Sequence, residues 1–72
     1  MEYDYSELTG RIVTKCSTRS KFAEKMGLSE RALSLKLNNK LSWKQNEMEK
    51  ASEVLDFSKS DIQTYFFTLK VQ

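Results

Sequence analysis

Apolar residues recur near the start of the chain at the spacing of a helix face. The pattern predicts a helix after Asp4, because Asp4-x-x-Glu7 resembles a capping box. Its apolar face is made of residues three or four positions apart, namely Tyr5, Leu8, Ile12 and Cys16. We expect the Cys16 thiol to be buried with this face.

The next two predicted helices are short and are joined by a glycine turn. Thr18 is the expected N-cap of the second helix, and Gly27 ends it in the left-handed conformation that is common after a helix. Ser29 is the expected N-cap of the third helix, which runs to about Asn38. The Asn38-Asn39 pair should end it, since asparagine tolerates left-handed geometry better than most residues.

Two more helices are predicted in the second half of the chain. Ser42-x-x-Gln45 predicts a capping box at the start of the fourth helix, and Ser58-x-x-Asp61 opens the fifth. The residues expected to point inward from these two helices are Met48, Ala51, Leu55, Ile62, Tyr65 and Phe66. Residues 67–72 alternate apolar and polar, which indicates a short strand or an extended tail. The prediction is an all-α domain of five helices over residues 1–72.

The composition supports helices and excludes several functions. The chain of 72 residues has no proline and 2 glycines, fewer turn residues than a β-sandwich or barrel needs. Histidine is absent and there is 1 cysteine, which removes most metal sites, the Ser-His-Asp and Cys-His catalytic arrangements and any intrachain disulfide. We therefore expect that the protein is not an enzyme and has neither a cofactor nor a small-molecule substrate.

The sequence predicts neither a membrane span nor a signal peptide. No apolar run approaches the roughly 20 residues of a membrane span. The first ten residues are acidic, whereas a signal peptide begins with a basic region. These features predict a cytoplasmic protein.

The net charge of +2 hides an uneven distribution. Residues 11–44 hold 9 basic and 2 acidic residues, whereas the segments before and after them are both net acidic. A basic middle between acidic ends suits a face that binds a polyanion. A solvated helix surface fits the same distribution equally well.

The most specific pattern lies between Thr18 and Lys40. Ala23 stands four residues before Gly27, where a small side chain lets two helices pack closely, and Leu33 stands six residues after it, where it inserts between them. This is the packing pattern of a helix-turn-helix. The segment AEKMGLSERALSLKLNNK resembles the phage repressor and Cro family of helix-turn-helix proteins.

The resemblance implies a fold and a function. Members of that family are all-α, bind operator DNA and are usually dimers. The helix-turn-helix would span about residues 18–39 of a single lambda repressor-like domain. Asn39 stands where many relatives have glycine, and no cleavage or oligomerisation domain follows, so the chain is more similar to a small Cro-type regulator.

The outward face of the third helix follows from its inward face. Leu33 and Leu37 define the inward direction, so at about 100° per residue Arg31 and Leu35 point nearly opposite. In the resemblance, the positions that reach base edges in the major groove are Glu30, Arg31, Ser34 and Leu35. Arg31 would bind guanine O6 and N7 through two hydrogen bonds.

Each of these assignments has a structural alternative. The alternative for Arg31 is a solvated surface arginine, and the alternative for Glu30 is a residue that complements the helix dipole. For Leu35 the alternatives are a dimer contact and an ordinary exposed leucine.

Other residues around the third helix are expected to hold phosphates. Helix N-termini offer free amides, and basic side chains offer charge. The expected phosphate-contacting residues are Thr18, Arg19, Lys21, Ser29, Asn38, Asn39, Lys40 and Lys44. Lys36, at the edge of the buried face, is equally compatible with a structural lysine and a phosphate ligand. We expect Met26 and Met48 in the core and Trp43 at the junction of the third and fourth helices.

The C-terminal residues predict a dimer interface. Two symmetric half-sites distinguish operators better than one small monomer can. The residues expected to pack inward or against a second copy are Tyr65, Phe66, Phe67, Leu69 and Val71. Alternatively, the tail folds back on its own core.

The sequence thus predicts a sequence-specific regulator that binds double-stranded operator DNA as a homodimer. Its third helix would enter the major groove, and the bound dimer would block transcription in the cytoplasm of the bacterial host. The alternative is a protein-interaction module of the same fold, such as an antitoxin or adaptor. The polar and basic third helix favours nucleic acid, because a protein-binding helix should be apolar.

Overall fold

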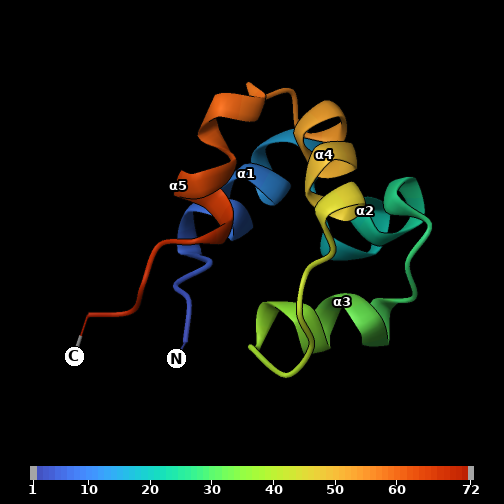
Figure 1. Cartoon of the computed structure of the whole chain (residues 1–72). Helices are drawn as coiled ribbons and strands as arrows, with labels where there is room; N and C mark the ends of the chain where they lie inside the picture. The colour runs from blue at the N-terminus through green and yellow to red at the C-terminus, as the bar shows by residue number, and fades with distance from the viewer. Residues whose placement is uncertain (1, 72) are drawn as a thin grey trace.

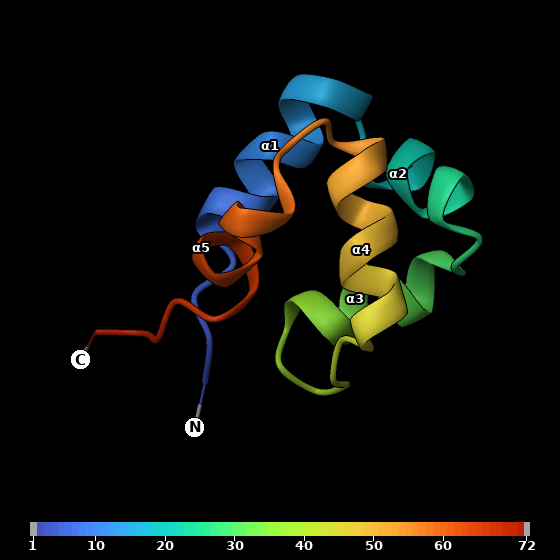
Figure 2. The same cartoon turned by 45° about the horizontal axis from the view of Figure 1, so that its top comes forward.

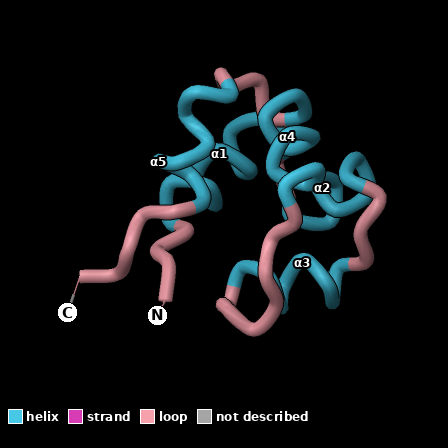
Figure 3. Tube along the Cα trace, in the orientation of Figure 1, coloured by secondary structure: helices cyan, strands magenta, loops and turns pink. Residues whose placement is uncertain are grey.

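Five α-helices and one 3-10 turn make up the secondary structure of residues 2–71, the part of the chain that the computed structural model describes. In chain order the elements are α1 (Ser6–Cys16), α2 (Arg19–Met26), α3 (Glu30–Leu37), α4 (Gln45–Val54), η1 (Lys59–Asp61) and α5 (Ile62–Phe66). Figure 1 shows α3 at one end of the molecule, with the other helices grouped beyond it. The predicted all-α fold is confirmed, and residues 2–71 contain no strand (Figure 3).

One apolar core joins all five helices. The largest side chains that it encloses completely are Leu8, Ile12, Phe22, Leu33, Leu55 and Phe66. Ala23 and Met26 are buried beside them, and Met48 packs against the core while half-buried, as the helical spacing predicts. Cys16 is a buried free thiol. None of the helices within residues 2–71 has the length and apolar character to span a bilayer.

The α2–turn–α3 segment forms as the sequence predicts. The Thr18 hydroxyl accepts a hydrogen bond from the Lys21 amide at 3.1 Å, and the Ser29 hydroxyl accepts one from the Ala32 amide at 3.0 Å. Gly27 lies between the two helices with φ +73°, the left-handed region that favours glycine. Because α2 packs against α1, α3 and α4, it connects α3 to the rest of the fold.

The other helix starts differ from the prediction. Tyr5 is the N-cap of α1, and the Asp4 carboxylate accepts from the Ser6 amide at 2.9 Å without the predicted Glu7 partner. Ser58 caps η1, and α5 follows this turn directly. In both cases the predicted polar residue accepts a hydrogen bond in the turn just before the helix that it was expected to cap.

The predicted Ser42–Gln45 capping box is wrong. The N-cap of α4 is Lys44, whose amide donates to the Glu47 carboxylate at 2.9 Å. The carbonyl of Ser42 instead accepts a hydrogen bond from the Lys36 ammonium at 2.9 Å. Ser42 therefore ties the α3–α4 loop to α3 and does not begin α4.

The two ends of the chain lie side by side (Figures 1 and 2). Residues after α5 are extended, and an isolated antiparallel bridge pairs Tyr3 with Leu69. The Asp4 amide donates to the Thr68 carbonyl at 2.6 Å, and the Lys70 amide donates to the Glu2 carbonyl at 3.2 Å. The C-terminal residues thus form an extended tail that pairs with the N-terminal segment.

Candidate nucleic-acid interface

The outward face of α3 carries side chains that are exposed to solvent. Glu30, Arg31 and Ser34 are exposed, and Leu35 is half-buried. Within residues 2–71, no ion pair or side-chain hydrogen bond engages Glu30 or Arg31. Leu33, on the other side of the helix, is 1% exposed and fixes which face points away from the core.

Of the two alternatives predicted for Lys36, a structural lysine and a phosphate ligand, the structure shows the first. Its side chain is buried on the inward face of α3, and its ammonium nitrogen lies 2.9 Å from a carboxylate oxygen of Glu47. The same nitrogen donates to the Ser42 carbonyl and lies 5.6 Å from the centre of the Trp43 ring. Lys36 therefore anchors α3 to the start of α4 and does not face a DNA groove.

Glu47 completes this anchor, and the sequence pattern gave no role to it. One of its carboxylate oxygens accepts from both the Lys36 ammonium and the Lys44 amide. Burial raises the pKa of Glu47, but these two hydrogen bonds and the charges of Lys36 and Lys44 outweigh it, so the pKa is lowered. The position of Lys36 three residues after Leu33 was the available signal, because that spacing returns to the inward face.

Trp43 is buried, but its neighbours extend beyond the predicted α3–α4 junction. Its ring meets Phe66 of α5 edge to face, with centroids 5.0 Å apart. Phe66 is 1% exposed, so it belongs to the core and not to the predicted dimer interface. Leu37, predicted to mark the inward direction together with Leu33, packs against the core while half-buried, and Lys36 is the more deeply buried neighbour of Leu33.

Exposed cations lie on the two segments that flank α3 along the chain. Arg19 and Lys21 lie in the first turn of α2, and Lys40 and Lys44 lie in the loop between α3 and α4. Thr18 and Ser29 have the structural role of caps, and both hydroxyls remain exposed at helix N-termini. The fold thus gathers most of the predicted phosphate-contacting residues at two helix starts and one loop.

The side chains of the two asparagines after α3 have different hydrogen-bond partners. The Asn38 side chain is exposed and donates to the Ser34 carbonyl at 2.9 Å. Asn39 adopts φ +62°, and its side chain accepts from the Tyr3 amide at 2.9 Å and donates to the Tyr3 carbonyl at 3.0 Å. These bonds give the Asn39 side chain a structural role, and its phosphate contact stays a prediction.

The tail residues divide between packed and exposed side chains. Tyr65 is half-buried and stacks on Phe57 with centroids 4.2 Å apart. Phe67 and Leu69 are about half-exposed, and Val71 is 97% exposed. The fold therefore leaves three of the five predicted interface residues with exposed apolar surface.

A hollow lies between the chain ends and the loop after α3. Its volume is about 270 Å³. Its lining is aromatic and apolar at Tyr3, Tyr5, Leu41, Trp43, Met48, Phe66 and Phe67, and polar at Asn39, Lys40 and Ser42. Leu41 and Phe67 are 45% and 43% exposed, so the hollow opens onto an apolar surface.

The comparison with protein families matches residues 1–69 to a model described as "Protein of unknown function (DUF739)". The chain belongs to this family. The DUF739 chain is also similar to a solved structure, the solution structure of the modulator of repression of the temperate bacteriophage TP901-1 from Lactococcus lactis. The two are 54% identical with a TM-score of 0.82, over 100% of this chain and 97% of the other. A comparison with curated proteins finds no match.

The DUF739 match gives the family but names no function. The likeness to the phage repressor and Cro proteins remains a resemblance in the helix-turn-helix segment. The solved relative nevertheless comes from a phage and is named for repression, which agrees with the predicted phage origin and regulatory class. Residues 2–71 of the DUF739 chain contain no cluster of three or more metal-ligating side chains.

Proposed function

We propose that the protein takes part in the control of repression in a bacteriophage and does so by binding double-stranded operator DNA through α3. The observation that carries the proposal is the free outward face of α3, on which Glu30, Arg31 and Ser34 are exposed. The similarity to a phage modulator of repression supports the regulatory part of the proposal. DNA binding itself rests on the chemistry of this face.

The proposed contacts divide into reading and positioning. Arg31 binds a guanine edge through two hydrogen bonds, and Leu35 packs on a thymine methyl group. Glu30 accepts from a cytosine amino group or orients Arg31. The backbone amides at the starts of α2 and α3, with Lys21, Lys40 and other cations, hold phosphates and give an affinity that falls with salt.

The proposed active form is a homodimer joined through the tail. Leu69 and Val71 expose apolar side chains, and within residues 2–71 no backbone hydrogen bond engages the Leu69 amide or carbonyl. An unpaired extended edge can pair with a second copy. A two-fold axis through such an edge would present two α3 helices to two half-sites.

The proposed mechanism is steric and needs no catalysis. A dimer bound at a promoter occupies the DNA that polymerase or a rival regulator requires. The protein would act in the bacterial cytoplasm, without a cofactor and without enzymatic activity.

Selection of duplexes from a random DNA library tests the proposal. We expect an inverted repeat with half-sites about one helical turn apart. Arg31→Ala should relax one base position in each half-site. Lys59→Ala should leave the selected sequence unchanged, because η1 lies on the opposite side of the molecule from α3 (Figure 1). Enrichment of no sequence would contradict the proposal.

A protein-interaction module is the second candidate, and one observation favours it. The hollow beside Leu41 and Phe67 has aromatic and apolar walls interrupted by Asn39, Lys40 and Ser42. Its exposed rim is apolar, and such mixed surfaces often bind proteins. Leu41→Glu separates the candidates, because it disrupts this surface while leaving the α3 face intact. Loss of regulation with retained DNA binding would favour the protein partner.

A further inference from the structure

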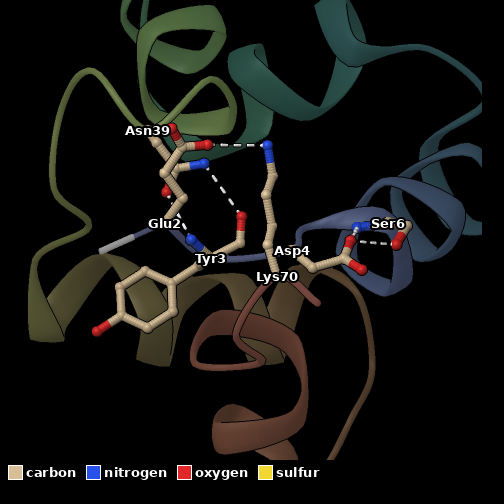
Figure 4. Close-up of polar contacts among 6 residues, drawn as sticks. All are labelled: Glu2, Tyr3, Asp4, Ser6, Asn39 and Lys70. Carbon is tan, nitrogen blue, oxygen red and sulfur yellow. Dashed lines mark hydrogen bonds and ion pairs between the residues drawn. The ribbon is translucent and has the colours of Figure 1, made fainter. Parts of the chain in front are cut away.

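Asn39 connects two regions of the chain that are far apart in sequence. It lies directly after the α3 C-cap, and its side-chain amide forms two hydrogen bonds with the backbone of Tyr3, of 2.9 Å and 3.0 Å (Figure 4). The side chain thereby satisfies both backbone groups of Tyr3, much as a neighbouring strand would. This contact holds the N-terminal segment against the loop that follows α3.

The opposite edge of the same N-terminal segment is bound to the tail. The backbone of Glu2 and Asp4 exchanges hydrogen bonds with Lys70 and Thr68. The side chains of Glu2 and Lys70 add an ion pair of 3.0 Å, drawn in Figure 4. Residues 2–4 therefore lie between Asn39 and the tail, with hydrogen bonds on both edges.

The loop is in turn fixed to α3. The amides of Lys40 and Leu41 both donate to the Leu35 carbonyl, at 2.8 Å and 3.2 Å. Lys36 holds the Ser42 carbonyl from within the same helix. A displacement of Asn39 therefore changes the hydrogen bonds at the C-terminal end of α3.

Asparagine satisfies two requirements at this position. The backbone φ of +62° is accessible to glycine and asparagine at low cost. Only asparagine of these two also offers an acceptor and a donor to Tyr3. Aspartate would keep the acceptor but would place a carboxylate oxygen against the Tyr3 carbonyl.

We infer that Asn39 is a positioning residue that couples the loop after α3 to the paired chain ends. Loosening either region then loosens the other. A second copy or another molecule bound at the tail would alter the loop beside α3, and a ligand at the loop would alter the tail to the same thermodynamic extent. The inference concerns the free protein and goes beyond the proposed DNA binding, so neither depends on the other.

Amide hydrogen exchange of the free full-length protein, measured by NMR, tests the coupling from the loop side. Asn39→Gly keeps the backbone conformation accessible and removes the side-chain bonds. We expect exchange to accelerate about tenfold at Tyr3 and also at the tail-paired amides of Asp4 and Lys70, relative to core amides of α1. Asn38→Gly is the matched control, because the Asn38 side chain bonds to Ser34 and not to Tyr3.

Lys70→Pro tests the coupling from the tail side. It removes the Lys70 amide that bonds to Glu2, and we expect faster exchange at Tyr3, Lys40 and Leu41. Val71→Pro is the matched control, because no backbone acceptor binds the Val71 amide within residues 2–71. Unchanged Asp4 and Lys70 exchange in Asn39→Gly, or unchanged Lys40 and Leu41 exchange in Lys70→Pro, would overturn the inference.

Discussion

The α2–turn–α3 segment and the paired chain ends are held by different kinds of interaction. Local caps at Thr18 and Ser29 set the ends of two helices, and the fully buried Leu33 fixes their packing. The chain ends are held by backbone hydrogen bonds, by the side-chain bonds of Asn39 to Tyr3 and by the exposed Glu2–Lys70 ion pair, with Leu69 about half-exposed. We therefore expect the hydrogen bonds of the chain ends to open more readily than those of the α2–turn–α3 segment, which we call the platform.

We expect the largest difference in unfolding free energy between a variant of each region, Leu33→Ala and Leu69→Ala. Leu33 is enclosed in the core, so its truncation should lower the free energy of unfolding by about 3 kcal/mol. Leu69 is 48% exposed, so its truncation should cost about 0.5 kcal/mol or less. Urea denaturation of both variants measures the difference, and equal losses would show that the tail belongs to the core.

Lys36→Met tests whether the buried ion pair anchors α3. The variant leaves Glu47 beside the Lys44 amide without its cation, and we expect a loss of about 2 kcal/mol of unfolding free energy. The double variant Lys36→Met, Glu47→Gln should recover part of that loss, because the uncompensated charge is removed. A single variant as stable as the wild type would mean that Lys36 is dispensable for the platform.

Thr18→Ala and Ser29→Ala measure the two caps. Each hydroxyl satisfies one helix amide, so each variant should lose about 1 kcal/mol of unfolding free energy. Ser58→Ala is the control, since Ser58 caps only the short η1 turn, with a longer hydrogen bond of 3.3 Å. If Ser58→Ala lost as much unfolding free energy as the other two variants, the caps of α2 and α3 would stabilise the fold no more than the cap of η1 does.

The smallest effect expected is a dependence of stability on acid pH. The fold lowers the pKa of Glu47 below its ordinary 4.5, so the stabilisation by its carboxylate is complete above that value. It is lost as pH falls through the lower folded pKa. Glu47→Gln should therefore be less stable than the wild type at neutral pH, and the difference should shrink in acid. A difference that stays constant with pH would exclude this role of the carboxylate.

The contrast also explains what the sequence could predict. Thr18, Gly27 and Ser29 act on residues within a few positions of themselves, so local patterns were sufficient to place α2 and α3. The bond between Asn39 and Tyr3 joins residues 36 positions apart, and no local pattern points to it. Lys36 was ambiguous because its burial depends on Glu47, which a different helix supplies.

The candidate site follows the same division. Glu30, Arg31 and Ser34 are exposed because Leu33 faces the core, which helical geometry predicts. The predicted interface residue Phe66 instead packs on Trp43, and the direction in which α5 lies on the core decided this. Sequence patterns thus located the face of α3 but not the division of the tail between core and surface.

The salt dependence of DNA affinity tests the central claim most directly. The wild-type protein would be titrated with the duplex enriched from the random library, at ionic strengths from low to physiological and above. Binding through several phosphate contacts predicts that the logarithm of the affinity falls steeply and linearly with the logarithm of the salt concentration, with a shallower slope for Lys40→Ala. An affinity that salt does not change, or no affinity for any duplex, would contradict the account and transfer the function to a protein partner.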